Sequence, residues 1–167
     1  MRSIRKALFY LSVGLDWLAH FVRYWGKRSF GDSKDIAGVR VVLVRDGKVV
    51  LVKHWYAPGV WTLPGGGLMK GEKATDGATR EVFEEVGYTI KSFSGELGIY
   101  EGRRGRGDSV IVLCSEDFEG SIKMLPNLEI MERSFFDLRH LPYNLSPANR
   151  RRVESYIAGA RNERDYW

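Results

Sequence analysis

The sequence predicts a mixed fold of the α/β or α+β class, and two patterns indicate it. Short runs rich in β-branched residues are interspersed with segments of helical periodicity along the chain. The length of 167 residues suits one compact domain. Apolar residues make up 44% and charged residues 28%, which argues against general disorder and is typical of a globular protein.

Residues 4–25 predict an apolar, amphipathic helix that begins the chain. A narrow polar stripe runs along it, so most of its circumference must be buried. Asp16 in its middle argues against a membrane-spanning helix, and a signal-peptide cleavage site is absent. Three surfaces could bury the apolar face of this helix: the domain's own surface, a second subunit in a homodimer, or a peripheral membrane interface. A protein surface is favoured over the membrane. With the linker Lys27–Lys34 this segment makes residues 1–34 a unit of their own. The polar stripe consists of Arg5, Ser12, Asp16, His20, Arg23 and Lys27.

The next segment predicts a β-hairpin. Two β-branched runs, Val39–Val44 and Val49–Val52, flank Asp46-Gly47, and this dipeptide is a strong signal for a tight turn with positive φ angles. The aromatic residues Trp55, Tyr56 and Trp61 follow, and either core packing or stacking on a nucleobase would explain them.

The remaining elements alternate between helix and strand. A helix is predicted over residues 73–86 with Gly87 as its end. Strands are predicted over Tyr88–Tyr100, Ser109–Ser115 and Glu132–Leu138. Ser146-Pro147 predicts the start of a final helix that reaches about Ala160, with Ser146 as N-cap.

The basic residues exceed the acidic ones, and the net charge is +5. This excess would attract nucleotides, RNA or acidic lipid without choosing among them. Arg103, with Arg104 and Arg106, lies in a glycine-rich turn that would contact substrate phosphate or an RNA backbone, or else form a solvated loop. The run 150–152 is interpreted as surface charge, because three consecutive residues fan out around a helix. The single cysteine, Cys114, is predicted to be a buried thiol, and the lack of an internal disulfide fits the cytoplasm.

Chemistry concentrates in a glycine-rich loop and the helix after it. Glu81, Glu84 and Glu85 are three and four residues apart, so their carboxylates share one helix face. Such like charges destabilise a helix by about 0.2–0.5 kcal/mol per pair, whereas a bound Mg²⁺ would make the arrangement favourable. A solvated acidic face is the alternative. In the loop, Gly65, Gly66 and Gly67 would let the backbone approach a ligand closely.

These residues resemble the Nudix box, which spans residues 66–88 here. The spacing matches, with five residues from Gly66 to Glu72 and seven more to Arg80, and only Tyr88 departs mildly, because the family favours an aliphatic residue there. The matching positions are Gly66, Glu72, Arg80, Glu81, Val82, Glu84, Glu85, Val86 and Gly87.

The resemblance implies a Nudix-type α/β/α sandwich with a mixed sheet in residues 35–167. It implies that Glu81, Glu84 and Glu85, with the Gly66 carbonyl, bind Mg²⁺ or Mn²⁺. Glu72 and Arg80 would hold the site together, and Arg80 is also a candidate catalytic residue. Glu129 is the first choice for an additional ligand or base, with Glu132 second.

The implied reaction is metal-dependent hydrolysis of a phosphoanhydride bond in a nucleoside diphosphate linked to another moiety. Water would attack phosphorus, with Glu81 as the first choice for general base and Glu129 as the second. The signatures of ADP-ribose and NADH pyrophosphatases downstream of the box match poorly, so nucleoside triphosphates and capped or triphosphorylated RNA stay open. The alternative function is a non-catalytic module of this fold that senses a nucleotide or binds RNA, with residues 4–25 as a membrane contact.

Overall fold

A computed structural model describes residues 36–102, 109–122 and 129–167. The predicted helix over residues 4–25, the linker Lys27–Lys34 and Arg103, Arg104 and Arg106 lie outside the described residues. Within the described part, no helix is long and apolar enough to cross a membrane.

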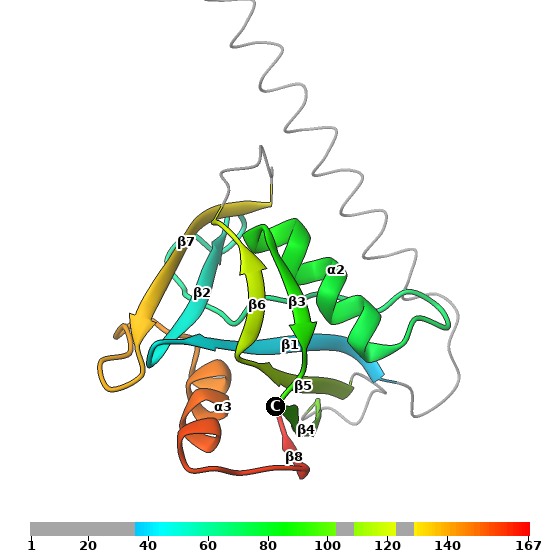
Figure 1. Cartoon of the computed structure of the whole chain (residues 1–167). Helices are drawn as coiled ribbons and strands as arrows, with labels where there is room; N and C mark the ends of the chain where they lie inside the picture. The colour runs from blue at the N-terminus through cyan, green and yellow to red at the C-terminus, as the bar shows by residue number, and fades with distance from the viewer. Residues whose placement is uncertain (1–35, 103–108, 123–128) are drawn as a thin grey trace, which may run out of the picture. The chain divides into compact units, whose positions relative to one another are not determined.

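A six-stranded mixed sheet forms the centre of the described domain (Figure 1). Its strand order is β7-β2-β1-β5-β4-β8, in which β1–β5 and β4–β8 pair in parallel and the other neighbours pair antiparallel. A second sheet pairs β3 with β6. The strands are β1 (Ile36–Arg45), β2 (Lys48–His54), β3 (Tyr88–Ser92), β4 (Gly95–Glu101), β5 (Ser109–Ser115), β6 (Asp117–Gly120), β7 (Ile130–Asp137) and β8 (Glu163–Tyr166).

The predicted hairpin is confirmed. Arg45 pairs with Lys48 across a two-residue loop. Asp46 and Gly47 adopt φ angles of 50° and 69°, the left-handed values that this kind of turn requires.

The two helices lie close to the positions that the sequence predicts. Helix α2 (Ala74–Val86) ends at Gly87, whose left-handed backbone donates its N–H to the carbonyls of Val82 and Phe83. Helix α3 (Pro147–Ile157) starts after Ser146, but the Ser146 side chain makes no capping hydrogen bond in the described structure. It also ends before Ala160, because the chain turns there towards the short strand β8.

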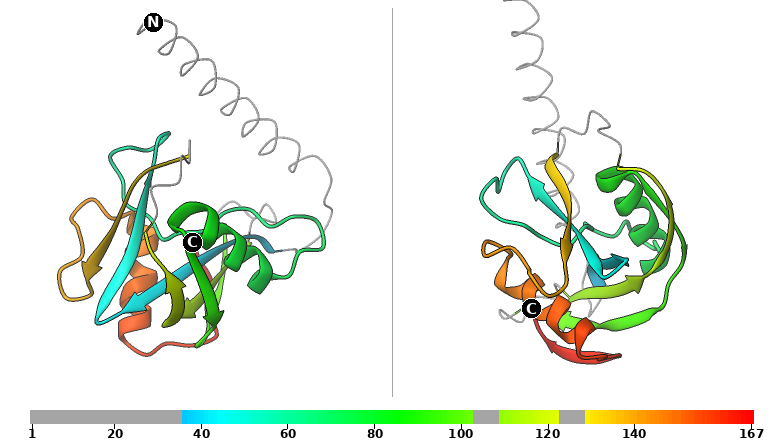
Figure 2. Two further views of the ribbon diagram at one scale, coloured as in Figure 1. Left: turned by 45° about the horizontal axis from the view of Figure 1, so that its top comes forward. Right: turned by 60° about the vertical axis from the view of Figure 1, so that its left-hand side comes forward.

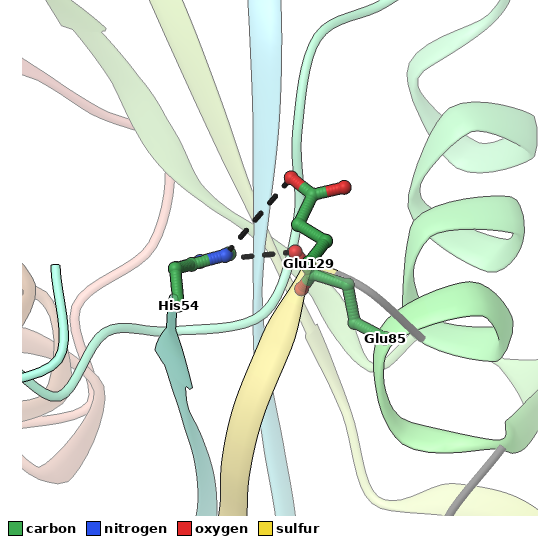
Figure 3. Close-up of side chains that lie close together, drawn as sticks. All are labelled: His54, Glu85 and Glu129. Atoms are coloured by element: carbon green, nitrogen blue, oxygen red, sulfur yellow. Dashed lines mark ion pairs between the residues drawn. The ribbon is translucent and has the colours of Figure 1, made fainter. Parts of the chain in front are cut away.

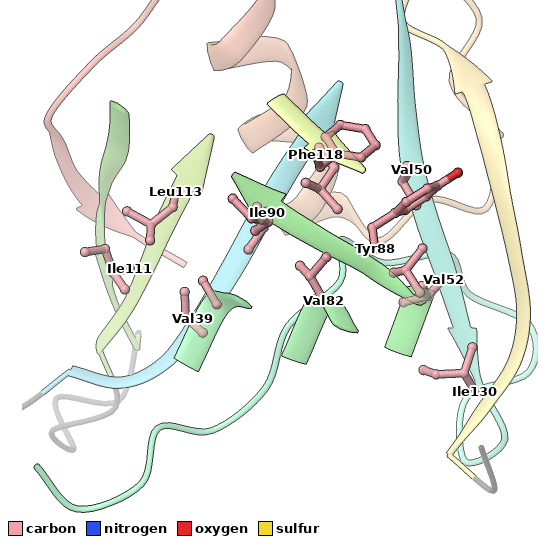
Figure 4. Packing of buried hydrophobic residues seen from close by; sticks show 14 residues of the cluster. Val39, Val50, Val52, Val82, Tyr88, Ile90, Ile111, Leu113, Phe118 and Ile130 are labelled. Carbon is pink, nitrogen blue, oxygen red and sulfur yellow. The ribbon is translucent and has the colours of Figure 1, made fainter. Parts of the chain in front are cut away.

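The sheet lies between the two helices, so the architecture is an α/β/α sandwich (Figure 2). Alternate residues of β1 and β2 explain it, since strand side chains point to opposite faces in turn. Val39, Val41, Val50 and Val52 pack with Val82 of α2, as Figure 4 shows for most of them. Residues of the opposite parity pack in a second core with Val153 of α3. The second set includes Val42, Val44, Val49 and Leu51.

The predicted strand Tyr88–Tyr100 is wrong as a single element. The strand is interrupted near Ser94, whose backbone N–H donates to the Cys114 carbonyl at 2.8 Å. The residues before and after this point belong to different sheets. Tyr88 joins the core beside α2, whereas Tyr100 joins the core beside α3. The sequence pattern does not separate β3 from β4, because both are amphipathic and they follow each other closely, although they contribute to different cores. Cys114 is buried as predicted, and burial raises the pKa of its thiol to about 11.

The interpretation of the 150–152 run as surface charge is wrong for Arg152. Only 2% of Arg152 is exposed, and its guanidinium lies 3.6 Å from the centroid of the Tyr100 ring. Its Nη2 donates to the Tyr166 carbonyl at 2.7 Å, so it attaches α3 to β8. Sequence periodicity did not predict β8, a short polar strand, and this strand covers Arg152.

Candidate active site

The glycine-rich loop lies directly against β1. The backbone N–H of Val39 donates to the Gly66 carbonyl and that of Val41 to the Pro64 carbonyl, both at 2.9 Å. At Gly65, where φ is 133°, a Cβ atom would lie 2.2 Å from the Val39 carbonyl oxygen. Only glycine fits this contact, so packing within the protein already explains the residue. Substrate contact by Gly65, Gly66 and Gly67 stays a prediction.

Gly66 also faces the helix carboxylate that the sequence singles out. A Cβ on Gly66 would lie 2.6 Å from both carboxylate oxygens of Glu81. The loop and α2 therefore meet at the Glu81 carboxylate, and a side chain at position 66 would displace it.

Arg80 connects the loop to the helix. Its Nε and Nη2 donate to the two carboxylate oxygens of Glu72 at 2.8 and 2.9 Å, and its Nη1 donates to Glu81 at 2.7 Å. The hydrogen bond to Glu72 is the main reason that the pKa of Arg80 is raised. Arg80 Nη1 also lies 3.5 Å from Glu84 Oε2 one turn along the helix, and this contact is weaker because it is longer. Arg80 therefore orients Glu72 and Glu81 rather than forming a simple pair along the helix.

Glu84 and Glu85 are consecutive residues of α2 and have different surroundings. The side chain of Glu84 is 51% exposed, whereas that of Glu85 is 3% exposed. The Glu85 carboxylate accepts the Gly65 N–H at 2.8 Å. Burial nevertheless holds the pKa of Glu85 well above its ordinary value, although the Arg40 charge and the Gly65 N–H oppose this, and the negative charges of Glu81 and Glu129 add to it.

His54 brings an imidazole to these carboxylates (Figure 3). Its Nε2 lies 3.8 Å from Glu85 Oε1, and its Nδ1 lies 4.0 Å from Glu129 Oε1. The ring stacks on Tyr56, with centroids 4.8 Å apart and an angle of 20° between the planes. Sequence patterns indicated no chemical role for His54. Its position two residues after Val52 in an alternating strand was the available signal, because it places His54 on the face towards α2.

The two further acidic candidates, Glu129 and Glu132, have different partners. Glu129 precedes β7 and reaches the cluster, whereas Glu132 accepts a hydrogen bond from Lys53 Nζ at 2.7 Å. The same ammonium lies over the Trp61 ring of the other core. The structure thus brings Glu129 to Glu85 and places Glu132 elsewhere. Trp61 is a core residue, while Trp55 and Tyr56 are 57% and 62% exposed.

The residues fit a divalent cation by the chemistry of their donor atoms. Potential ligand atoms of His54, Glu85 and Glu129 lie within 4.8 Å of one another. Carboxylate oxygens are ligands that Mg²⁺ and Mn²⁺ accept, and a cation would neutralise the buried charge of Glu85. The Gly66 carbonyl already accepts the Val39 N–H, which leaves one lone pair for a ligand.

Comparisons with known proteins agree with this architecture. A family profile described as NUDIX domain matches residues 34–156. A Bacillus subtilis (strain 168) protein, named as a candidate 8-oxo-dGTP diphosphatase, is 28% identical over 122 residues, covering 73% of this chain and 79% of the relative.

An ADP-ribose pyrophosphatase of Methanocaldococcus jannaschii is 31% identical over 105 residues, covering 60% of this chain and 61% of its own length, which is less than two thirds. Among solved structures, a MutT NUDIX hydrolase from Burkholderia pseudomallei is 28% identical with a TM-score of 0.62. That match covers 71% of this chain and 95% of the other.

Proposed function

Because this chain belongs to the NUDIX domain family, we propose that it hydrolyses a phosphoanhydride bond in a nucleoside diphosphate linked to another moiety, with Mg²⁺ or Mn²⁺ as cofactor. The chain is a Nudix-type pyrophosphohydrolase, as the names of its relatives indicate. The divalent cation and the nucleoside diphosphate are the proposed part.

The main support for this function is that several carboxylates converge on one glycine-rich loop. Glu81 packs on Gly66, Glu85 accepts the Gly65 N–H, and Glu129 reaches the same place from the start of β7. A buried carboxylate such as Glu85 is costly in its charged form without a compensating cation. A fold alone gains little from collecting these groups, whereas phosphate hydrolysis needs them.

The chain's own residues would divide the work as follows. Glu81, Glu84 and Glu85 would hold the cation together with the Gly66 carbonyl, and Glu129 would add a ligand or a base. A bound divalent cation supplies charge neutralisation at the diphosphate and a more acidic water. Glu81 is the first choice to accept the proton of the attacking water, since Arg80 fixes its orientation at 2.7 Å. Glu72 would keep Arg80 in place.

The nucleoside part of the substrate is supported by the relatives and by exposed aromatic rings. The names of these two relatives both specify a nucleotide, a nucleoside triphosphate in one and ADP-ribose in the other. Trp55 and Tyr56 follow His54 directly and are both more than half exposed, and the Tyr56 ring stacks on His54. An exposed ring at this place suits stacking on a base, which contributes about 1–3 kcal/mol in nucleic-acid complexes.

A substrate panel tests the proposal. The purified full chain is incubated with nucleoside diphosphate derivatives, nucleoside triphosphates, triphosphorylated RNA and inorganic pyrophosphate, each with Mg²⁺, Mn²⁺ or excess chelator. We expect release of a nucleoside monophosphate from at least one nucleoside diphosphate derivative or nucleoside triphosphate, only when cation is present. Undiminished hydrolysis in excess chelator, or cleavage confined to RNA or inorganic pyrophosphate, would contradict the proposal.

A further inference from the structure

An irregularity between β2 and β7 sets the position of His54. The register pairs Lys53 with Glu132 but His54 with Ile130, so Met131 is an extra residue in β7. Such bulges bend a strand and change the direction of neighbouring side chains, often beside active sites. The backbone N–H of Trp55 then donates to the Glu129 carbonyl at 3.0 Å. Main-chain contacts thus hold the segments that carry His54 and Glu129 together.

The imidazole is fixed in a buried position. His54 is 2% exposed, and its ring stacks on Tyr56. It follows Val50 and Val52 on the face that packs against α2, where Glu85 is. A strand, a helix and the approach to a second strand therefore each bring one side chain to this point, as Figure 3 shows.

The separations suit ligands of one ion better than direct hydrogen bonds. His54 Nε2 lies 3.8 Å from Glu85 and Nδ1 lies 4.0 Å from Glu129, beyond the usual hydrogen-bond range. Two ligands that are each ~2.1 Å from an ion lie between ~3.0 Å apart at right angles and ~4.2 Å apart on opposite sides. One ion binds only one of the two ring nitrogens, and one ligand atom from each of the three residues lies within 4.8 Å of the other two, so small side-chain movements would bring all three onto one ion.

We propose that His54 is a nitrogen ligand of the divalent cation in this site, next to Glu85 and Glu129, and that it makes the site select Mn²⁺ over Mg²⁺. The inference rests on the proposed function in placing a cation here. Mg²⁺ is bound almost exclusively through oxygen ligands, whereas Mn²⁺, which shares the preference for oxygen, accepts an imidazole nitrogen more readily because it is a transition metal. A histidine among carboxylates therefore shifts the preference towards Mn²⁺ without preventing Mg²⁺ from binding.

Pulsed electron paramagnetic resonance on the Mn²⁺-loaded full chain tests this without any substrate. The sequence contains three histidines, so the double variant His20→Gln/His140→Gln leaves His54 as the only one. We expect the Mn²⁺ signal of wild type and of this double variant to show coupling to an imidazole nitrogen. Labelling histidine with ¹⁵N should change the coupling frequency. Mn²⁺ bound without nitrogen coupling in the double variant overturns the proposal, and no change at the active site is needed for that result.

Cation affinities provide the second measurement. We expect His54→Gln to weaken Mn²⁺ binding at least ~10-fold in calorimetric titration, on the scale of a change in the shell of a metal site, and Mg²⁺ binding less than ~3-fold. His140→Gln is the matched control and should change neither. Equal weakening of both cations by His54→Gln would contradict selectivity for Mn²⁺.

The two proposals can fail separately. Nitrogen coupling without hydrolysis of any nucleotide leaves His54 as a ligand and removes the proposed function. Nucleotide hydrolysis with Mg²⁺ and no nitrogen coupling supports the proposed function and removes His54 as a ligand.

Discussion

Arg80 holds Glu72 through two parallel hydrogen bonds, from Nε to Oε1 at 2.8 Å and from Nη2 to Oε2 at 2.9 Å. The same Glu72 carboxylate accepts the backbone N–H of Met69 at 2.7 Å. The pair therefore fastens the loop before α2 to the helix that carries Glu81.

The first prediction follows from this forked contact. Arg80→Lys keeps the charge but loses the fork, so kcat for the identified substrate should fall roughly 10- to 100-fold, as for changes around metal ligands. Arg139→Lys is the matched control, since Arg139 makes a similar forked contact with Asp137 in an exposed turn. It should leave kcat unchanged. Equal effects of the two substitutions would show that Arg80 has no special role.

The second prediction concerns the helix carboxylates. Glu84→Gln and Glu85→Gln should each lower kcat at least ~10²-fold, the scale for losing one electrostatic stabiliser. Glu154→Gln in α3, an exposed helical glutamate, is the control and should keep wild-type kinetics. Steady-state assays with saturating cation decide it. Near-normal rates in both site variants would mean that neither carboxylate takes part in the reaction.

The third prediction concerns pH and stability without metal. Because the pKa of Glu85 is raised by burial, the folded protein keeps this proton at pH values where the unfolded chain has lost it. Stability must then fall as pH rises from the ordinary value of 4.5 towards the raised one. Glu85→Gln removes that loss, so in excess chelator its Tm should exceed that of wild type by a margin that grows with pH.

Thermal unfolding at pH 5 and pH 8 measures this margin. Glu84→Gln is the control, because its half-exposed side chain should give a smaller and less pH-dependent effect. A Tm for Glu85→Gln that falls further below wild type at pH 8 than at pH 5 would reverse the assigned direction.

The fourth prediction tests the buried arginine of α3. Arg152 lies over Tyr100, donates to the Tyr166 carbonyl and has Glu163 and Asp165 within 4.0 and 3.9 Å. Arg152→Met should lower the free energy of unfolding by roughly 1–3 kcal/mol, because the Tyr166 carbonyl loses its part-buried hydrogen bond while the more exposed acids regain water. Arg151→Met, one residue earlier and exposed, should change it by less than ~0.5 kcal/mol. Denaturant unfolding measures both variants. Equal destabilisation by the two substitutions would show that Arg152 has no special structural role.

The fifth prediction concerns residues 4–25, which the sequence alone describes. Their narrow polar stripe requires a cover, and we propose protein, either the domain or a second copy of the chain. Replacing Trp17 and Phe21 by Asp should then reduce solubility or dimerisation, measured by light scattering. Sedimentation with anionic liposomes tests the other cover. Strong liposome binding that disappears on deleting residues 1–28, with a monomeric remainder, would favour the membrane.

Local patterns determined much of this protein. The Asp46-Gly47 turn, the start and end of α2 and the common face of Glu81, Glu84 and Glu85 follow from backbone preferences over a few residues. The box spacing was sufficient to indicate the family, because its residues act within one loop and one helix. Cys114 could be assigned to the core since it lies in an apolar strand.

Tertiary structure decided whatever depends on segments distant in the sequence. The register irregularity between β2 and β7 brings His54 to Glu85 and Glu129, and sequence periodicity does not report which strands will pair. The burial of Glu85 beside half-exposed Glu84 depends on the loop and strands packed over one side of α2. Arg152 is buried because β8 returns to pair with β4. A local pattern specifies which residues share a face, but only long-range packing determines what covers that face and therefore which charges are kept from water.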